Sequence, residues 1–144
     1  TDPTSSVFSL GNHVSTNDNG YDYIAYCFHS VDGYSKVGSY TGNSSADGTF
    51  VYTGFKPAYV MFKKTTGSDN WGIHDSKVND HEGNVISPFL KADSSDAEQD
   101  TGDSVDFLSN GFKWRVNSGL RNTSGQTYIY LAFAEHPFKY STAR

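Results

Sequence analysis

One pattern occurs twice in this chain, and it constrains the possible fold more than any other feature. In both places a polar turn containing Asn and Gly leads into a short run of aromatic and β-branched residues. The two copies lie 105 residues apart, since 122 − 17 = 105. Because such a period is typical of modular arrays, residues 1–28 resemble the end of a preceding unit. The matched positions are Asn17, Gly20, Tyr23, Ile24 and Phe28 in the first copy and Asn122, Gly125, Tyr128, Ile129 and Phe133 in the second.

The composition favours an all-β fold. Of the 144 residues, 15% are aromatic and only 19% are charged. Short apolar runs alternate with clusters of Gly, Asn, Asp and Ser, which predicts strands joined by turns. We expect one antiparallel β-sandwich, or a jelly-roll-like barrel, over residues 1–144, with about nine short strands and negligible helix.

The apolar runs give the expected strand positions. The clearest hairpin signal is the turn Ser109-Asn110-Gly111 between two runs of alternating apolar residues. One short helical turn is expected over residues 95–99. The candidate runs for these roughly nine strands are residues 7–10, 21–28, 35–40, 49–53, 58–65, 71–75, 85–90, 105–108, 112–116 and 128–135.

Several classes of partner are disfavoured by charge and hydropathy. The net charge of −5 argues against nucleic acid, which requires a basic surface. Because no apolar run approaches the roughly 18 residues of a membrane span, we expect no membrane insertion. The single cysteine, Cys27, permits no intrachain disulfide, and its place between Tyr26 and Phe28 predicts a buried thiol in a strand.

Residues 76–102 are rich in acids and poor in apolar residues, which predicts a long surface connection. Asp93, Asp96, Asp100 and Asp103 suggest two possible chemistries, a calcium site or a carboxylate pair that cleaves polysaccharide. Neither has a diagnostic spacing. A solvated acidic loop is the favoured interpretation.

One hypothesis for His74, Asp75 and His81 is a metal site. Imidazole and carboxylate groups suit zinc or a related cation when their lone pairs converge. The spacing matches no established metal motif, and Asp80 and Glu82 beside His81 add only charge. We expect a structural or solvated role for these residues, and we expect no cofactor.

Trp71 is the best candidate for contact with a sugar ring. Its neighbours Asp69, Asn70 and His74 supply polar groups that can bond sugar hydroxyls. Trp114 alternates with apolar residues and is expected to face the core instead. Further exposed rings are expected among Tyr34, Tyr40, Tyr52 and Tyr140.

Five longer strings are together more specific than any single motif: residues 23–28, 33–40, 48–58, 106–113 and 128–138. These strings resemble an uncharacterised domain family found at the C-terminal ends of bacteriophage structural proteins, especially marine ones. The resemblance covers residues 7–144. It implies a virion component such as a tail fibre or decoration protein, and it brings no catalytic residues.

The expected function is therefore a non-enzymatic virion module, exposed on the particle surface or otherwise extracellular. Its expected partners are further copies of itself, with a trimer favoured, other virion proteins and a host-surface glycan. Two alternatives remain open. One is a carbohydrate-binding module, and the other is a subunit of a non-viral extracellular filament.

Overall fold

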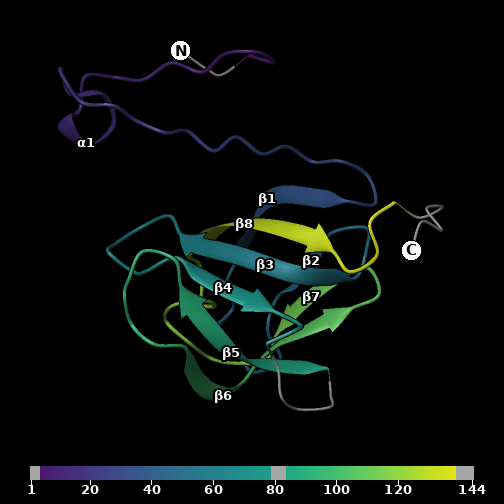
Figure 1. The fold of residues 1–144 in the computed structure, drawn as a ribbon. Coiled ribbons are helices and arrows are strands. Elements are labelled where there is room, and N and C mark those ends of the chain that lie inside the picture. The colour runs from purple at the N-terminus through teal and green to yellow at the C-terminus, as the bar shows by residue number, and fades with distance from the viewer. Residues whose placement is uncertain (1–3, 79–83, 139–144) are drawn as a thin grey trace.

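The computed structural model describes residues 4–78 and 84–138, and it contains one short helix and eight strands (Figure 1). The all-β prediction is confirmed. In chain order the elements are α1 Val14–Asn17, β1 Ser35–Thr41, β2 Phe50–Tyr52, β3 Pro57–Lys64, β4 Gly72–Asp75, β5 Val85–Lys91, β6 Gln99–Leu108, β7 Gly111–Trp114 and β8 Thr127–Ala134.

The strands form a single sheet in the order β1-β8-β3-β4-β5-β6-β7-β2, and every strand pair is antiparallel. The sheet curls until its first and last strands approach each other, so it nearly closes into a barrel. Of the two expected architectures, a sandwich and a jelly-roll-like barrel, the structure is therefore barrel-like and is not a sandwich. Successive hairpins from β3 to β7 keep each strand beside the one before it, and shifts of register in β3 and β5 bend the sheet further.

The segment between β1 and β2 joins the two ends of the curled sheet. The Thr49 hydroxyl donates to the Thr41 carbonyl at 2.7 Å, and the Gly48 N–H donates to the Trp114 carbonyl at 3.0 Å. A Cβ atom at Gly48 would lie 2.4 Å from that carbonyl oxygen, so the close approach requires glycine here.

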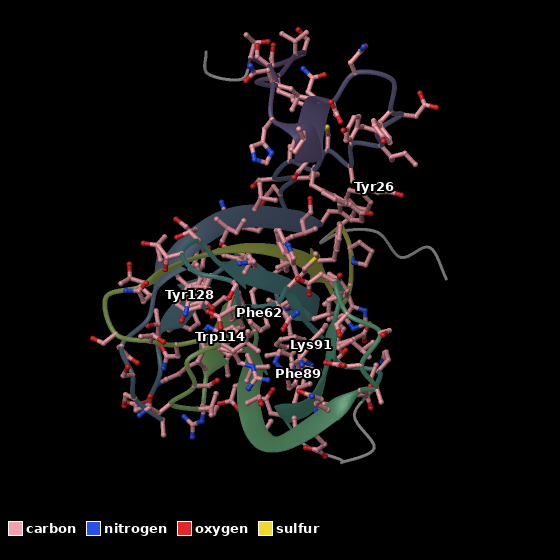
Figure 2. All side chains as sticks on the ribbon, turned by 90° about the vertical axis from the view of Figure 1, so that its left-hand side faces the viewer. Tyr26, Phe62, Phe89, Lys91, Trp114 and Tyr128 are labelled. Atoms are coloured by element: carbon pink, nitrogen blue, oxygen red, sulfur yellow. The ribbon has the colours of Figure 1, made fainter. Side chains whose placement is uncertain are left out.

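Aromatic rings fill the interior of the barrel. Trp114 is fully buried, with its ring centroid 4.9 Å from that of Phe62 and 5.9 Å from that of Tyr40 (Figure 2). Tyr40 in turn stacks on Tyr128 at 4.9 Å. The expectation that Trp114 faces the core is confirmed, whereas Tyr40 is buried rather than exposed.

The β6–β7 hairpin forms where the sequence predicted it. Leu108 pairs with Gly111, so Ser109 and Asn110 make the connecting turn. This register puts Phe107 opposite Phe112. Both rings are buried in the core, so the turn also sets the packing of the two strands.

Asn122 connects the loop before β8 to the loop after β1. Its fully buried side-chain amide donates to Asn43 Oδ1 at 3.0 Å, to the Ser45 carbonyl at 2.9 Å and to the Val116 carbonyl at 3.2 Å. Its own Oδ1 accepts from the Asn43 N–H at 2.9 Å. One side chain therefore supplies a partner for three backbone groups, the Asn43 N–H and the Ser45 and Val116 carbonyls.

Residues 4–30 form an N-terminal arm that extends away from the barrel, and every residue of the arm except Asp18 is exposed (Figure 1). The strands expected at residues 7–10 and 21–28 are absent from the structure, because no neighbouring strand pairs with either segment. Cys27, expected to be buried, is exposed for the same reason. A short helix that the sequence analysis missed, α1, begins here after His13, whose Nδ1 accepts from the Ser15 N–H at 3.1 Å.

Two further expectations fail in the acidic stretch. Residues 95–98 have no helical turn, and Gln99 begins strand β6. The stretch is also less irregular than expected, since β6 begins within it at Gln99, in addition to β5, which forms where a strand was expected at residues 85–90. Pairing between β5 and β6 supplies backbone partners that the polar sequence did not suggest.

We predict that Asn122→Ala lowers the free energy of unfolding by about 3 kcal/mol, because it removes the four hydrogen bonds that this fully buried side chain makes. Asn17→Ala is the matched control at the corresponding position of the exposed arm, and we expect it to change that free energy by less than about 0.5 kcal/mol. Urea denaturation of both variants checks this. Equal losses would contradict the assigned role of Asn122.

Candidate functional site

The predicted sugar-binding residues lie at the connection between β3 and β4, and the structure brings three of the four together. Trp71 and Asn70 are half-buried, and both donate to Asp93 Oδ1, from the backbone N–H at 3.1 Å and from the side-chain amide at 3.2 Å respectively. Asp69 forms an ion pair with Lys64. The Trp71 backbone is thus held at a turn whose neighbouring residues are polar.

His74 is not part of that surface. Its imidazole is fully buried between the rings of Phe62 and Phe89, each with its centroid 5.9 Å from the imidazole, and beside Trp114 at 5.8 Å. Its Nδ1 lies 2.9 Å from the Pro88 carbonyl oxygen. The alternation of β4 turns this side chain toward the core, so the predicted sugar contact by His74 was wrong.

A buried arginine accompanies His74 in the interior. Arg121 is 2% exposed, its guanidinium lies 4.2 Å from the centroid of the Phe89 ring, and its Nη1 donates to the Ser104 hydroxyl at 3.3 Å. Burial lowers the pKa of Arg121 to about 10. Burial, with the Arg121 charge as a second cause, lowers the pKa of His74 to about 3, so this imidazole is neutral at ordinary pH.

The described residues of the predicted metal site do not come together in the structure. His74 and Asp75 are adjacent on β4 and point to opposite faces of the sheet, and Asp75 Oδ1 accepts from the Lys77 N–H at 2.8 Å. His81, with Asp80 and Glu82, lies outside the described residues. Within residues 4–78 and 84–138, no three His, Cys, Asp or Glu side chains gather as a metal site.

The acids of the β5–β6 region form separate local contacts. Asp96 pairs with Lys91 at 2.7 Å, and this contact lowers the pKa of the Asp96 carboxyl. Asp100 accepts from the Ser87 hydroxyl and from the Gly102 N–H. Asp93 is turned toward Trp71 instead, as described above. All of these partners are nearby groups of the protein itself, as expected for an ordered polar loop.

A groove that the sequence analysis did not predict lies at one end of the barrel, next to the base of the arm. Its walls combine exposed rings with a pair of opposite charges. Lys56 and Glu135 pair at 2.8 Å, which lowers the pKa of the Glu135 carboxyl. The lining residues are Asp32, Gly33, Tyr52, Gly54, Phe55, Lys56, Ser109, Glu135, His136 and Phe138. They come from segments far apart in the sequence, and among them only Tyr52 had been expected to present an exposed ring.

The arm carries the largest set of exposed apolar side chains. Ile24 and Tyr26 are each 80% exposed, and Figure 2 shows Tyr26 well away from the labelled core rings. Among the described residues, the rings of the arm contact those of the barrel only at the base of the arm, where Phe28 lies 6.1 Å from Phe133. The exposed apolar residues are Val7, Phe8, Leu10, Val14, Tyr21, Tyr23, Ile24, Tyr26 and Phe28.

Comparison with protein families matches residues 1–137 to a family described as Domain of unknown function (DUF7483). The chain belongs to the DUF7483 family. The match includes both the arm and the barrel, so both are parts of the DUF7483 sequence. No curated protein and no solved structure matches the chain.

Across the described part of this DUF7483 chain, no helix is long and apolar enough to cross a membrane. The only helix there is α1, which spans Val14–Asn17.

The buried His74 predicts a specific loss of stability in mild acid. Its pKa is about 3 in the folded state against 6.5 as the ordinary value, so the unfolded chain binds the proton more readily. The resulting stabilisation is complete above pH 6.5 and is lost as the pH falls toward about 3, by up to about 1.4 kcal/mol per pH unit. His74→Phe removes this contribution while keeping a ring in the aromatic cluster.

Urea titrations of both proteins between about pH 7.5 and about pH 5 test this prediction. The other four histidines, His13, His29, His81 and His136, are present in both proteins, so their contributions cancel in the comparison. Parallel pH profiles for the original chain and His74→Phe would contradict the assignment.

Proposed function

We propose that this chain is a non-enzymatic assembly module of an extracellular particle, a virion component of the tail-fibre or decoration type. The observation that carries the proposal is the exposed apolar surface of the arm. Burying one such side chain fully is worth about 1.5–3 kcal/mol, so a row of exposed rings favours contact with another protein. An arm of this kind suits a subunit of an assembly better than a free-standing molecule.

The barrel supports the same proposal by its rigidity. Its interior is packed with rings, and its loops are joined by side chains such as Asn122. A rigid scaffold presents its loops with little loss of conformational entropy on binding. That property is useful to a particle surface that engages a host or a neighbouring subunit.

The end groove is the proposed contact surface on the barrel itself. Its lining includes the exposed side chains of Tyr52 and Phe138 together with the Lys56–Glu135 ion pair. Rings with a nearby polar pair suit a protein or glycan surface of mixed character. Several copies on one particle would add avidity to a weak individual contact.

Fractionation of the source culture tests the proposal. Antibodies against the purified chain should detect it in density-gradient fractions that contain intact particles, and should label those particles by electron microscopy. Recovery of the protein only as a small soluble species, absent from any particle or filament, would overturn the proposal. Recovery on non-viral filaments would favour the filament alternative.

Glycan binding is the second candidate, and the half-exposed Trp71 ring favours it. The bonds from Asn70 and the Trp71 backbone to Asp93 hold the backbone of this turn in place, so the turn presents the half-buried Trp71 from a fixed position. We predict that Trp71→Ala abolishes binding on a glycan array made from host-surface polysaccharides. Trp71→Phe should keep part of it.

The control for this prediction is Tyr52→Ala, which removes an exposed ring from the end groove instead. Array signals that are the same for the original chain and Trp71→Ala would remove the Trp71 site. A loss with Tyr52→Ala alone would move the glycan site to the end groove.

A further inference from the structure

The two copies of the sequence pattern share a backbone conformation as well as residue types. In the arm, the Asn17 N–H donates to the His13 carbonyl at 2.9 Å. In the loop before β8, the Asn122 N–H donates to the Ser118 carbonyl at 2.8 Å. Both donor and acceptor are displaced by the same 105 residues that separate the sequence copies. The local chain therefore turns in the same way at both places.

The side chains of the two asparagines repeat a second bond. The Asn17 amide donates to the Gly11 carbonyl at 2.8 Å, and the Asn122 amide donates to the Val116 carbonyl at 3.2 Å. The glycines that follow also match, since Gly20 has φ +85° and Gly125 has φ +71°. This left-handed conformation favours glycine, which explains why the residue recurs.

The tyrosines repeat two more bonds. The Tyr23 hydroxyl accepts from the Asp18 N–H at 3.0 Å and donates to the Val14 carbonyl at 2.8 Å. Such a hydroxyl locks the loop onto the strand that follows it. The corresponding bonds in the barrel join the Tyr128 hydroxyl to the Thr123 N–H at 3.0 Å and to the Gly119 carbonyl at 3.0 Å.

The barrel copy has partners that the arm copy lacks in the described chain. Strand β8 pairs on one side with β1 and on the other with β3. Asn122 also bonds to the loop at Asn43 and Ser45, whereas no corresponding loop contacts Asn17. The arm thus has the shape of a closing strand and its entry loop, without the barrel that such a strand closes.

We infer that residues 11–28 are the closing strand of a second barrel of this fold, one that supplies a β1-like strand, a β3-like strand and an Asn43-like loop. The arm occupies the position between those two strands that β8 occupies here. The inference rests on the proposed assembly function and names its partner. That partner is a preceding unit of the same fold, joined to this barrel through residues 29–34.

The alternation of side chains along the arm fits the position that β8 occupies in the barrel. In β8 the residues that point into the barrel are Tyr128, Tyr130 and Ala132, all buried. The residues at the same offset in the arm are Tyr23, Ala25 and Cys27. A small residue at the last place suits the fully buried site of Ala132, and it explains why an apolar thiol stands on a segment that is exposed here.

A complete second copy of this chain is a poor partner, because its own β8 already fills the position. Entry of the arm would have to break the pairing of β8 with both β1 and β3. The fitting partner is a barrel that receives its last strand from residues 11–28. Consecutive units that repeat every 105 residues meet this condition. In such an array, residues 11–28 would be the last strand of one unit, and residues 29–34 would lead into the next.

A tandem protein tests the inference. Residues 29–115 are placed directly before residue 11 of the chain, so that residue 11 follows 115 as residue 116 does here. Cys27 is the only cysteine of this protein. We expect its reaction with a water-soluble thiol reagent to be about 100-fold slower than in the chain alone, because opening a buried strand is rare. Near-ultraviolet circular dichroism should report a second packed aromatic core.

Matched variants keep the result interpretable. In the chain alone, Cys27→Ser combined with Ala132→Cys gives the reference rate for a thiol at the buried position. Ala25→Tyr in the tandem restores the ring that Tyr130 supplies here, in case the first barrel is left with a cavity. Deleting Ile24 shifts the strand by one residue, which turns the opposite side chains inward and should restore fast labelling.

A positive control replaces residues 11–28 of the tandem by residues 116–133 with Ala132→Cys. It should give two barrels and a protected thiol. Fast labelling of Cys27 in the tandem, with and without Ala25→Tyr, would overturn the inference. So would failure of the positive control, because residues 29–34 would then be unable to join two barrels.

These outcomes are distinct from a failure of the proposed function. The tandem measurement uses no particle, and the particle fractionation uses no tandem. A protected thiol with no particle association would keep the modular array and remove the virion role. A labelled thiol with particle association would leave an assembly module whose arm binds a different surface.

Discussion

The two-sided pairing of β8 is the interaction on which the rest of the barrel depends. Without β8 the first strand would have no neighbour, because β1 pairs only with β8 in the sheet order. The loop that introduces β8 contributes Asn122, which fixes the segment between β1 and β2, and the strand itself contributes Tyr128 to the stack with Tyr40. Closure of the sheet and packing of its core are therefore set by the same segment.

Much of the fold followed from local sequence patterns. The turn at Asn110 and the inward-facing Trp114 were predicted because turn geometry and strand alternation are encoded by neighbouring residues. The choice between a sandwich and a curled single sheet could not be predicted, because it depends on which distant strands pair. Residues 21–28 show the limit clearly. Their pattern is that of β8, yet a strand exists only where a partner supplies its hydrogen bonds.

The candidate sites also differ in whether they could be predicted from neighbouring residues. The turn at Asp69, Asn70 and Trp71 lies within one short segment, so sequence neighbours indicated it. His74 was misplaced because a His beside polar residues gives no sign of facing inward until the register of β4 is known. The end groove joins segments that are distant along the chain, and only tertiary structure could reveal it. The arm shows the same limit, since its apolar pattern predicted strands at residues 7–10 and 21–28 that the structure does not contain. The partner strands that would complete them are those of the second barrel that we propose.

Amide hydrogen exchange across the arm tests the central claim most directly, because it reports backbone pairing residue by residue. In the chain alone, residues 21–28 should exchange at the rate of an unpaired peptide while β8 is protected. When a barrel formed by residues 29–115 precedes residue 11, residues 21–28 should become protected to a degree comparable with β8. Exchange that stays fast in the presence of that barrel would contradict the claim that the arm is a closing strand.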